Sequence, residues 1–278
     1  MKLILSRKGF DSSFGGCASP IFEDDTPVSL PIPEDSARLR FSDITGKHLI
    51  GSIVEDLTRS LSKPLKASDH VHLDPDLQFD SLARKPGWRP LFGQADAAEG
   101  HLYNSKVAVG DIFLFFGWFR RVETRNGHVL FMPGAPDIHM FFGWLEVGDI
   151  WRLWEDCETP EWASEHPHIG ARYRKNTIYV AAQTATTYKA GVFSAYSDQL
   201  VLTAPGMSRS NWRLPKWFRP LEKNPKLSYH RSLSRWSSGD NYVDLKSVGR
   251  GQEFILDTAD YPEAVDWARA MIAAHSSM

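Results

Sequence analysis

Cysteine is scarce in this sequence, and long apolar segments are absent. Only Cys17 and Cys157 occur among the 278 residues, far apart and without a CxxC spacing. This excludes a disulfide-built scaffold and a zinc site made of cysteines. No run of about 18 apolar residues is present, so we expect no membrane-spanning helix. The apolar run after Met1 stops at Arg7 and Lys8, too early for a signal peptide. We therefore expect a cytoplasmic protein that does not enter a membrane.

The sequence also lacks an excess of charge of one sign. It has 32 Lys and Arg against 34 Asp and Glu, a formal net charge of -2. This excludes a strongly basic coat or tail protein, although a local basic face remains compatible with it. Hydrophobic residues make up 42% and aromatic residues 12% of the chain, enough for a buried core. No low-complexity linker divides the chain, so we expect residues 1–278 to form a single integrated domain.

The clearest strand pattern lies in the middle of the chain. The runs 112–119 and 138–147 are apolar on both faces, which predicts central, covered strands. Each contains the word Phe-Phe-Gly-Trp, and its glycine indicates a bulge or the close approach of another backbone. Asn126-Gly127 between the runs is typical of a hairpin turn. Further strands or extended segments are predicted at residues 1–8, 26–33, 128–132, 149–154, 176–183 and 198–203.

Two segments have the apolar spacing of amphipathic helices. Residues 52–62 place apolar side chains on one helical face, and a second helix follows Asp260, with Asp260 as its expected N-cap and Pro262 in its first turn. Residues 64–100 lack periodicity and predict a long ordered loop. Together the patterns predict an α+β fold: a mixed, largely antiparallel curved sheet or small barrel with flanking helices.

A glycine-rich turn follows the first predicted strand. The segment 6–16 combines Arg7 and Lys8 with hydroxyl groups, three glycines and Asp11. Backbone amides and two cations suit a phosphate or another anion, and Asp11 could act as a general base or orient a sugar hydroxyl. The segment matches neither the P-loop nor the dinucleotide fingerprint. The alternative is a tight turn in which Asp11 caps a backbone amide.

Histidines and aspartates alternate in the segment His70-Val71-His72-Leu73-Asp74-Pro75-Asp76. On a strand, His70, His72 and Asp74 would share one face, and this spacing permits a divalent metal. A polar site without metal is a second interpretation. The third is an Asx turn that Asp74 and Asp76 form around Pro75.

Other polar side chains flank the apolar strands. Gln94 begins a polar cluster that continues through His101 and predicts either a ligand site at the mouth of a barrel or a solvated loop. His139 and the loop His166-Pro167-His168 carry imidazoles, which suit proton transfer, metal binding or a structural hydrogen bond. No serine or cysteine lies in a nucleophile motif, so a hydrolase triad has no support.

Cations and aromatic residues alternate between residues 209 and 235. This stretch contains eight Lys or Arg and one acidic residue, Glu222. The pattern predicts a groove for a nucleic-acid backbone with stacking platforms for bases. The alternative is a solvated surface whose tryptophans turn into the core. The cations are Arg209, Arg213, Lys216, Arg219, Lys223, Lys226, Arg231 and Arg235, and the aromatic residues are Trp212, Trp217, Phe218 and Tyr229.

Several long words of the sequence are similar to those of one known family. They are Lys2-Leu3-Ile4-Leu5-Ser6-Arg7-Lys8-Gly9-Phe10-Asp11-Ser12, His72-Leu73-Asp74-Pro75-Asp76, Gly110-Asp111 with Phe-Leu-Phe-Phe-Gly-Trp-Phe, His166-Pro167-His168 and Gly251-Gln252-Glu253-Phe254. Through them the chain resembles, nearly end to end, the nucleotide modification associated domain 3 family. The association of that family with DNA-base modification systems of phages and bacteria implies handling of modified nucleotides or nucleic acid, without implying a reaction or residue roles. Gly-Asp before an apolar strand also loosely resembles PUA-like barrels, which bind modified bases.

The leading hypothesis is a protein directed at nucleotides or nucleic acid and linked to DNA base modification, acting as a base- or nucleotide-modifying enzyme. Arg7 and Lys8 would hold phosphate. Carboxylates would position or deprotonate a hydroxyl, amine or water, and a histidine would shuttle a proton. The candidate catalytic residues are Asp11, Asp74, His101 and His139. Further ligand contacts are expected from Asp76, Gln94, Trp118, Trp144, His166 and His168. The polynucleotide contacts are expected from Arg209, Arg213, Lys216, Arg219 and Arg231.

Two alternatives belong to other classes. A non-catalytic reader of modified bases would use aromatic walls such as Trp118 and Trp144, and would have no clustered acid and base. A metal-dependent hydrolase would use the alternating segment of His70, His72 and Asp74, with Asp76. No motif identifies a cofactor, a substrate or an oligomeric state.

Overall fold

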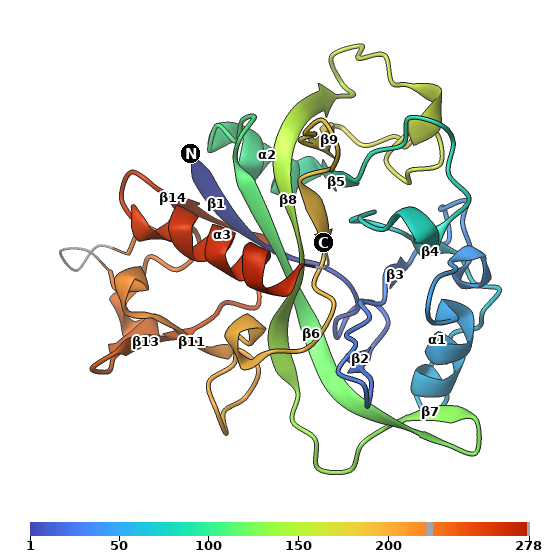
Figure 1. Ribbon diagram of the computed structural model, residues 1–278, viewed down its shortest axis with the longest axis horizontal. Helices are drawn as coiled ribbons and strands as arrows, with labels where there is room; N and C mark the ends of the chain where they lie inside the picture. The colour runs from blue at the N-terminus through green and yellow to red at the C-terminus, as the bar shows by residue number, and fades with distance from the viewer. Residues whose placement is uncertain (221–224, 277–278) are drawn as a thin grey trace.

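A large curved sheet forms the centre of the molecule in the computed structural model, which describes residues 1–220 and 225–276 (Figure 1). The expected cation Lys223 lies outside the described residues. The main path of the sheet has the strand order β14-β1-β6-β8-β9-β5, with β2 and β7 paired to β6 and β10 paired to β8. Its strands are β1 (Lys2–Arg7), β2 (Ser19–Ile21), β5 (Leu91–Ala95), β6 (Ile112–Arg125), β7 (His128–Phe131), β8 (Ile138–Arg152), β9 (Asn176–Ala181), β10 (Ala190–Val192) and β14 (Glu253–Asp257).

The sheet is mixed and largely antiparallel, as the sequence predicts. β1 and β2 pair with β6 in parallel, whereas the other pairs of this sheet are antiparallel. Asn126 and Gly127 form the β6–β7 turn with φ of 50° and 78°, the conformation that an Asn-Gly hairpin favours. The register between β6 and β8 shifts between Phe115 and Phe116, so the expected irregularity lies beside Gly143.

The sheet curls without closing into a barrel. Within the described residues, the edge strands β14 and β5 share no hydrogen-bond ladder. Their side chains nevertheless meet, because Gln94 Nε2 on β5 donates a hydrogen bond of 2.6 Å to Glu253 Oε1 on β14. Of the two forms expected from the sequence, the structure therefore has the curved open sheet and not the small barrel. The loose resemblance to PUA-like barrels does not extend to a closed barrel.

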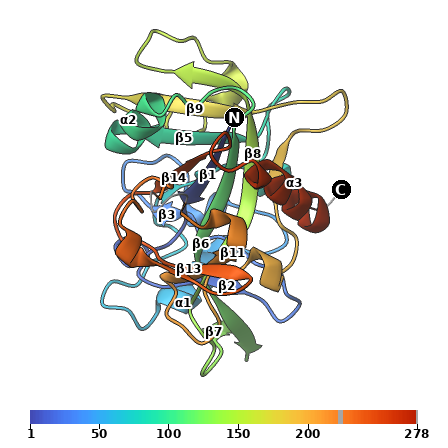
Figure 2. The same cartoon turned by 90° about the vertical axis from the view of Figure 1, so that its left-hand side faces the viewer.

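Two smaller sheets and three α-helices surround the central sheet in the described part of the chain (Figures 1 and 2). The smaller sheets are β3 (Ile32–Pro33) with β4 (Val71–His72), and β11 (Asn211–Pro215), β13 (Tyr242–Lys246) and β12 (Trp236–Ser238). The α-helices are α1 (Ile50–Thr58), α2 (Asp96–Asn104) and α3 (Glu263–His275). Single 3-10 turns are η1 (Phe41–Asp43), η2 (Phe79–Ser81), η3 (Glu161–Ala163), η4 (Asp198–Leu200), η5 (Lys216–Phe218) and η6 (Leu233–Arg235). Mixed helices and strands make this an α+β fold.

The helices cover different parts of the sheet. In Figure 1, α3 lies across β1 and β14, and α1 lies at the opposite side of the molecule beside β7. Ala264, Ala268 and Met271 of α3 belong to the same core as Leu3 and Leu5 of β1. None of the helices in the described residues is long and apolar enough to cross a lipid bilayer.

Some local expectations need correction. Helix α3 has Pro262 as its N-cap and no side-chain cap, so Asp260 does not cap it. Residues 149–154 do not start a new strand, because β8 runs on to Arg152. Residues 198–203 contain η4 and isolated bridges rather than a strand. The segment 64–100 is not one loop, because β4, η2, β5 and the start of α2 lie within it. These short elements depend on tertiary pairing rather than on local periodicity.

Candidate functional site

The glycine-rich turn after β1 is pressed against the middle of β6. Lys8 N donates to Phe116 O at 2.9 Å, and Phe10 N donates to Leu30 O at 2.9 Å. A β-carbon built on Gly117 would lie 2.8 Å from Lys8 O, so only glycine at this position lets the two backbones approach. The turn is therefore fixed to the centre of the sheet at Lys8, while its tip at residues 12–14 is exposed.

A cleft of about 340 Å³ opens beside this turn, a size within the range of about 300–1,000 Å³ that is usual for ligand pockets. We call it the central cleft. Five separate segments build it: the turn after β1, the β3–β4 pair with the residues that follow it, β5, the loop before β9 and the loop before β14. Its polar side chains are Arg7, Lys8, Asp11, His72, Asp74, Gln94, His168, Tyr173 and Gln252. The structure thus gathers many of the residues that the sequence singled out, although their roles stay predictions.

Arg7 is held by main-chain carbonyls rather than by a carboxylate. Its guanidinium donates to Gly249 O at 3.2 Å, Val248 O at 3.3 Å and Gly251 O at 2.5 Å. Its Nε is buried without a hydrogen-bond partner in the described residues. Burial lowers the pKa of the Arg7 guanidinium, with Arg209 acting in the same direction and Asp11 against it. An arginine stays charged at neutral pH, so a positive charge without an ion pair faces the cleft.

Lys8 is paired inside the protein. Its Nζ lies 3.1 Å from Glu253 Oε1 and 4.4 Å from the centre of the Phe92 ring. Only 8% of the Lys8 side chain and 1% of the Glu253 side chain is exposed. Glu253 Oε1 also accepts hydrogen bonds from Ser6 Oγ and Gln94 Nε2. The charge of Lys8 is thereby balanced, which leaves Arg7 as the better anion ligand of the two.

Asp11 stabilises its own turn. Its Oδ1 accepts hydrogen bonds from Ser13 N at 2.6 Å and Phe14 N at 2.8 Å. These are the bonds of the backbone-capping alternative. Asp11 nevertheless lines the central cleft, so its second oxygen can still meet a ligand.

A cluster of two imidazoles and one carboxylate forms the wall that lies across from the turn. Ligand atoms of His72, Asp74 and His168 all lie within 4.8 Å of one another. The rings of His72 and His168 meet edge to face, with centroids 5.1 Å apart. His72 comes from β4, Asp74 from the turn after β4, and His168 from the loop before β9. We call these three residues the His-Asp-His cluster.

The hydrogen bonds of the two histidines fix their tautomers. Asn176 Nδ2 donates to His168 O at 2.8 Å, so Asn176 Oδ1 must be the atom 2.7 Å from His168 Nδ1. His168 Nδ1 therefore carries a proton. Glu34 holds His72 Nδ1 in the same way through a carboxylate oxygen. These contacts occupy Nδ1 of both rings and leave Nε2 as the nitrogen available to a ligand.

These contacts and burial shift the pKa values of several side chains in and beside the cluster. Burial lowers the pKa of His168 to about 4, so the ring is neutral at pH 7. The hydrogen bond with His72 lowers the pKa of Glu34 to about 2. Burial opposes ionisation of Asp74, yet the contact with His166 and nearby positive charge hold the pKa of its carboxyl below the usual range. Both carboxyl groups are therefore ionised at neutral pH.

Asp74 is placed by β5 and by His166. Its Oδ1 accepts a hydrogen bond of 2.7 Å from Gly93 N and lies 3.3 Å from His166 Nε2. The Asp74 side chain is 5% exposed. Within the described residues, no Lys or Arg nitrogen forms an ion pair with Asp74. The carboxylate is thus held rigidly at the wall of the cleft with imidazoles as its ionisable close neighbours.

A second cavity of about 600 Å³ adjoins the central cleft. The two share Arg7, Asp11 and Gly249 in their walls. Arg209 lies over the Trp118 ring, with its guanidinium carbon 3.9 Å from the ring centroid, and both line this second cavity. Arg209 has no ion-pair partner in the part of the chain that the structure describes, so two unpaired guanidinium groups border the joined space.

His139 and His101 lie behind the site rather than in the central cleft. His139 borders the second cavity, and its Nδ1 accepts a hydrogen bond of 3.0 Å from Trp212 Nε1. Burial lowers the pKa of His139 to about 3. His101 Nε2 contacts Ser228 Oγ at 3.1 Å, and burial also lowers its pKa. Their suggested roles in proton transfer stay predictions.

The alternating histidine segment splits in the structure. β4 covers only residues 71–72. His70 lies directly before it in an isolated bridge to Arg40, and its Nδ1 contacts Asp35 O at 3.1 Å instead of the His-Asp-His cluster. Asp76 forms a buried two-pronged ion pair with Arg84, at 2.7 Å and 2.5 Å. Burial raises the pKa of Asp76 and Arg84 opposes that rise. His72 and Asp74 therefore form a cluster with His168, and His70 and Asp76 lie outside this cluster.

Most aromatic residues of the basic stretch are buried, whereas platforms for base stacking would be exposed. Trp212 and Phe218 are buried, and Trp217 packs against the main core. Tyr229 is 45% exposed. The cations remain at or near the surface, where Arg213 pairs with Asp244 at 2.9 Å. Lys216, Arg219 and Arg231 are exposed. Contact of these cations with nucleic acid stays a prediction.

The expected aromatic walls stand apart. Trp118 borders the second cavity beneath Arg209 and donates from Nε1 to Asp137 Oδ1 at 2.9 Å. Trp144 donates from Nε1 to Ser276 Oγ at 2.9 Å, and Ser276 follows helix α3. Trp144 lines neither the central cleft nor the second cavity. The two tryptophans therefore do not face each other across one pocket.

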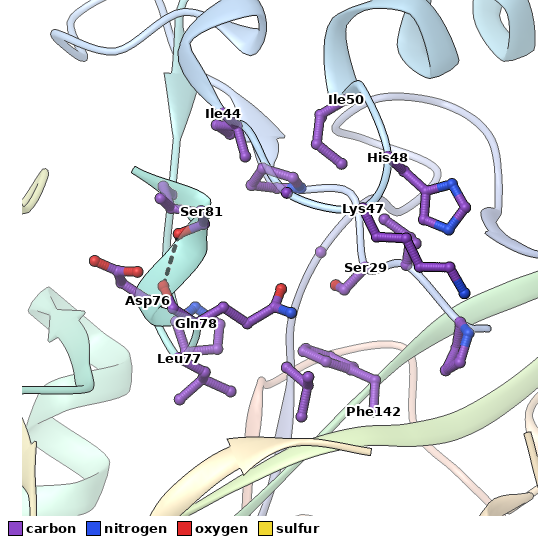
Figure 3. Close-up of a pocket in the computed structure, with 18 of the residues that line it drawn as sticks. Ser29, Ile44, Lys47, His48, Ile50, Asp76, Leu77, Gln78, Ser81 and Phe142 are labelled. Atoms are coloured by element: carbon purple, nitrogen blue, oxygen red, sulfur yellow. Dashed lines mark hydrogen bonds between the residues drawn. The ribbon is translucent and has the colours of Figure 1, made fainter. Parts of the chain in front are cut away.

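A third cavity, of about 250 Å³, lies on the other side of the segment that carries Asp74. Figure 3 shows Ile44 and Ile50 on one side and Leu77 and Phe142 on the other. Lys47, the cation of this pocket, pairs with Asp24 at 2.5 Å. Polar side chains, including His48 and Asp76, also line this cavity, but His72 and His168 do not.

Sequence reasoning missed the residues that hold the His-Asp-His cluster in place. Glu34 and Gly93 lie far in sequence from the residues they contact, and Asn176 lies eight residues after His168, but none of the three belongs to a motif. Glu253 belongs to one of the words that carry the family resemblance, which was the available signal. Tyr173 donates from its hydroxyl to Glu34 at 3.3 Å and gave no sequence signal.

Comparison with known proteins adds one finding. A family model described as nucleotide modification associated domain 3 matches residues 2–257 of the 278. The match includes β1, the glycine-rich turn, the His-Asp-His cluster and β14. No curated protein and no solved structure matches the chain.

Proposed function

This chain belongs to the nucleotide modification associated domain 3 family, and we propose from that premise that its central cleft binds a nucleotide, free or within DNA, and that the protein modifies the nucleotide or its base. One observation carries the proposal: Arg7, a cation without an ion-pair partner in the described residues, shares the cleft with the acid–base groups of Asp74 and His168. A cation that holds phosphate beside groups able to move a proton is what such a reaction needs.

The anion would bind between two guanidinium groups. Arg7 lines both cavities and Arg209 lines the second one, and neither has an ion-pair partner in the described residues. Guanidinium groups bind phosphate through two parallel hydrogen bonds, and the phosphate would neutralise charge that the protein leaves unpaired. Lys8, which we expected beside Arg7 as a phosphate ligand, would instead position the cleft through Glu253.

Two observations favour a modifying enzyme over a non-catalytic reader. The reader hypothesis requires aromatic walls without a clustered acid and base. Trp118 lies beneath Arg209, and Trp144 does not line the cleft. The cleft instead contains a carboxylate and two imidazoles whose ligand atoms lie within 4.8 Å of one another. Such groups are the usual agents of general acid–base and metal-assisted reactions.

Binding of deoxynucleoside 5′-monophosphates and of short single- and double-stranded DNA tests the proposal. We expect Arg7→Ala to weaken binding by about 10- to 100-fold, the effect of losing charge-assisted hydrogen bonds. Arg125→Ala is the matched control, because Arg125 is exposed on the β6–β7 hairpin and pairs with Glu123. Equal affinity of wild type and Arg7→Ala, or no binding to wild type, would contradict the proposal.

The salt dependence of affinity separates a free nucleotide from a polynucleotide. A DNA strand releases counterions from several phosphates, so its affinity falls steeply as salt rises. A mononucleotide loses far less. A shallow dependence for every ligand would assign the cleft to free nucleotides.

Modification itself is tested in cells that express the protein. Nucleosides from hydrolysed DNA and from the free nucleotide pool are compared by mass spectrometry between wild type and Asp74→Asn. We expect a nucleoside that is present with wild type and missing with the variant. Identical nucleoside profiles would argue for a reader.

We also propose that the chain is one cytoplasmic domain. The main hydrophobic core joins β1 near one end of the chain to α3 near the other, which supports one folding unit. Cys17 and Cys157 are both free thiols, as is usual in a reducing compartment.

A further inference from the structure

We propose that the His-Asp-His cluster binds a divalent transition-metal ion through His72 Nε2, His168 Nε2 and the Asp74 carboxylate. One ligand atom of each residue lies within 4.8 Å of the other two at the wall of the central cleft. The contacts of the two Nδ1 atoms with Glu34 and Asn176 leave Nε2 as the coordinating nitrogen of both rings. This inference rests on the proposed function only for its use, because ion binding by the cluster is a property of the chain alone.

Hydrogen bonds at Nδ1 leave Nε2 of both imidazoles directed to a metal rather than to a protein partner. The proton of His168 is on Nδ1 because Asn176 Oδ1 accepts it, and the proton of His72 is on Nδ1 because a Glu34 oxygen accepts it. Metal-bound histidines in proteins almost always donate their other ring N–H to a carboxylate or a carbonyl oxygen. The structure contains this outer arrangement for both histidines.

The carboxylate has an oxygen to spare. Gly93 N and His166 Nε2 both approach Asp74 Oδ1. In the described residues, Oδ2 takes part in no hydrogen bond. An oxygen anchored on one side thus leaves the other free to coordinate.

Charge favours a cation at this place. The Asp74 side chain is 5% exposed and has no Lys or Arg ion pair within the described chain. Glu34 adds a second carboxylate behind His72. A buried carboxylate is costly unless a cation or metal compensates it. A divalent ion would compensate these two carboxylates more directly than Lys8, whose charge acts on Asp74 without forming an ion pair with it in the described residues.

The ligand set indicates the class of metal. Two imidazoles and one carboxylate suit zinc, iron, cobalt, nickel or manganese better than calcium or magnesium, which prefer oxygen ligands. Bonds of about 2.1 Å place the ligands of a tetrahedral ion about 3.4 Å apart, so binding would draw the three side chains slightly together. Three protein ligands leave coordination positions open, as in catalytic sites. The open positions would face the central cleft.

Titration of metal-free protein with each ion alone tests the inference. The full chain is treated with a chelator, dialysed and titrated calorimetrically with Zn²⁺, Mn²⁺, Co²⁺, Ni²⁺ and anaerobic Fe²⁺. We expect one ion per chain in the micromolar range or tighter for at least one metal. His72→Ala, His168→Ala and Asp74→Asn should each weaken it by more than about 100-fold, and Glu34→Gln by about 10- to 100-fold.

His70→Ala is the matched control, because His70 is the same residue type two positions from His72 and contacts Asp35 O instead of the cluster. It should keep the wild-type affinity. Asp74→Asn and Glu34→Gln preserve side-chain shape, so they report on coordination even if a histidine variant fails to fold. Thermal unfolding gives a second readout: the metal should raise the midpoint for wild type and His70→Ala, and not for Asp74→Asn.

Two results would overturn the metal site. One is wild-type protein that binds none of the five ions in the micromolar range. The other is binding that survives Asp74→Asn and His168→Ala unchanged, which would place the ion elsewhere. Failure of the proposed function is a different outcome: the ion binds as expected, while nucleotides bind neither metal-free nor metal-loaded protein.

Discussion

The imidazole of His168 lies directly against Gly93 of β5. A β-carbon built at residue 93 would fall 2.3 Å from His168 Cδ2, a distance that real side chains do not tolerate. The amide of the same glycine donates to Asp74 Oδ1 at 2.7 Å. One residue without a side chain therefore makes room for one member of the His-Asp-His cluster and anchors another.

Gly93→Ala should displace the His168 ring. We expect the free energy of unfolding to fall by about 1–3 kcal/mol, the cost of overpacking a filled site, and the metal affinity of the cluster to fall with it. Gly100→Ala is the matched control in α2, because its new β-carbon would meet nothing closer than Lys175 Nζ at 4.0 Å. A helical Gly→Ala change should raise stability by about 0.5–1 kcal/mol. Urea denaturation measures both, and a neutral Gly93→Ala would show that the ring moves freely.

Lys8→Met should destabilise the protein strongly. The change leaves Glu253, 1% exposed, as a buried charge without its cation. Breaking a buried pair costs about 3–5 kcal/mol, and replacing both partners by uncharged residues in Lys8→Met/Glu253→Gln should recover part of this loss. Lys85→Met is the control, since the Lys85–Glu161 pair is exposed and should contribute no more than about 1 kcal/mol. An effect of Lys8→Met on nucleotide affinity without loss of stability would restore Lys8 as a phosphate ligand.

Glu99 should make stability depend on pH. Burial raises the pKa of this α2 carboxyl from 4.5 to about 7, and the hydroxyl of Tyr179 donates to it at 2.9 Å. The folded state therefore holds a proton that the unfolded state has lost between those values, so the contribution of Glu99 to stability falls as pH rises from 4.5 to 7. Below 4.5 that contribution is complete.

Glu99→Gln isolates this term, because the depressed histidine pKa values act in the opposite direction over part of the same range. We expect the unfolding free energy of wild type relative to Glu99→Gln to decline by a few kcal/mol across this window. Chemical denaturation at each pH measures it. A difference that stays constant with pH would show that Glu99 ionises normally.

Arg209 and Arg213 should differ in their contribution to DNA binding. Arg209 borders the second cavity and has no ion-pair partner among residues 1–220 and 225–276, whereas Arg213 is held by Asp244 at 2.9 Å. If a strand passes this cavity, Arg209→Ala should weaken binding and reduce the slope of log affinity against log salt by about one. Arg213→Ala should change neither. Equal effects of the two variants would move the contact to the surface of β11 and β13.

The secondary structure could be predicted from the sequence wherever the apolar periodicity was strong. The apolar runs of β6 and β8 predicted central strands, and the Asn126-Gly127 turn between them is present. The pattern of α3 fixed the helix but not its cap, because Pro262 starts it without a side-chain bond. Short strands such as β4 were out of reach, because two residues have no period and exist only through pairing with β3.

The candidate site followed the same division. The words around Arg7, His72, Asp74 and His168 marked chemistry-bearing residues, because residue type alone decides which groups can carry charge, protons or metal. Which of these residues contact one another depends on the tertiary structure and could not be predicted from the sequence. It paired Lys8 with Glu253 and Asp76 with Arg84, and it replaced His70 by His168 beside Asp74. Curvature of the sheet and the loop before β9 bring these groups together, and such long-range contacts leave no local pattern in the chain.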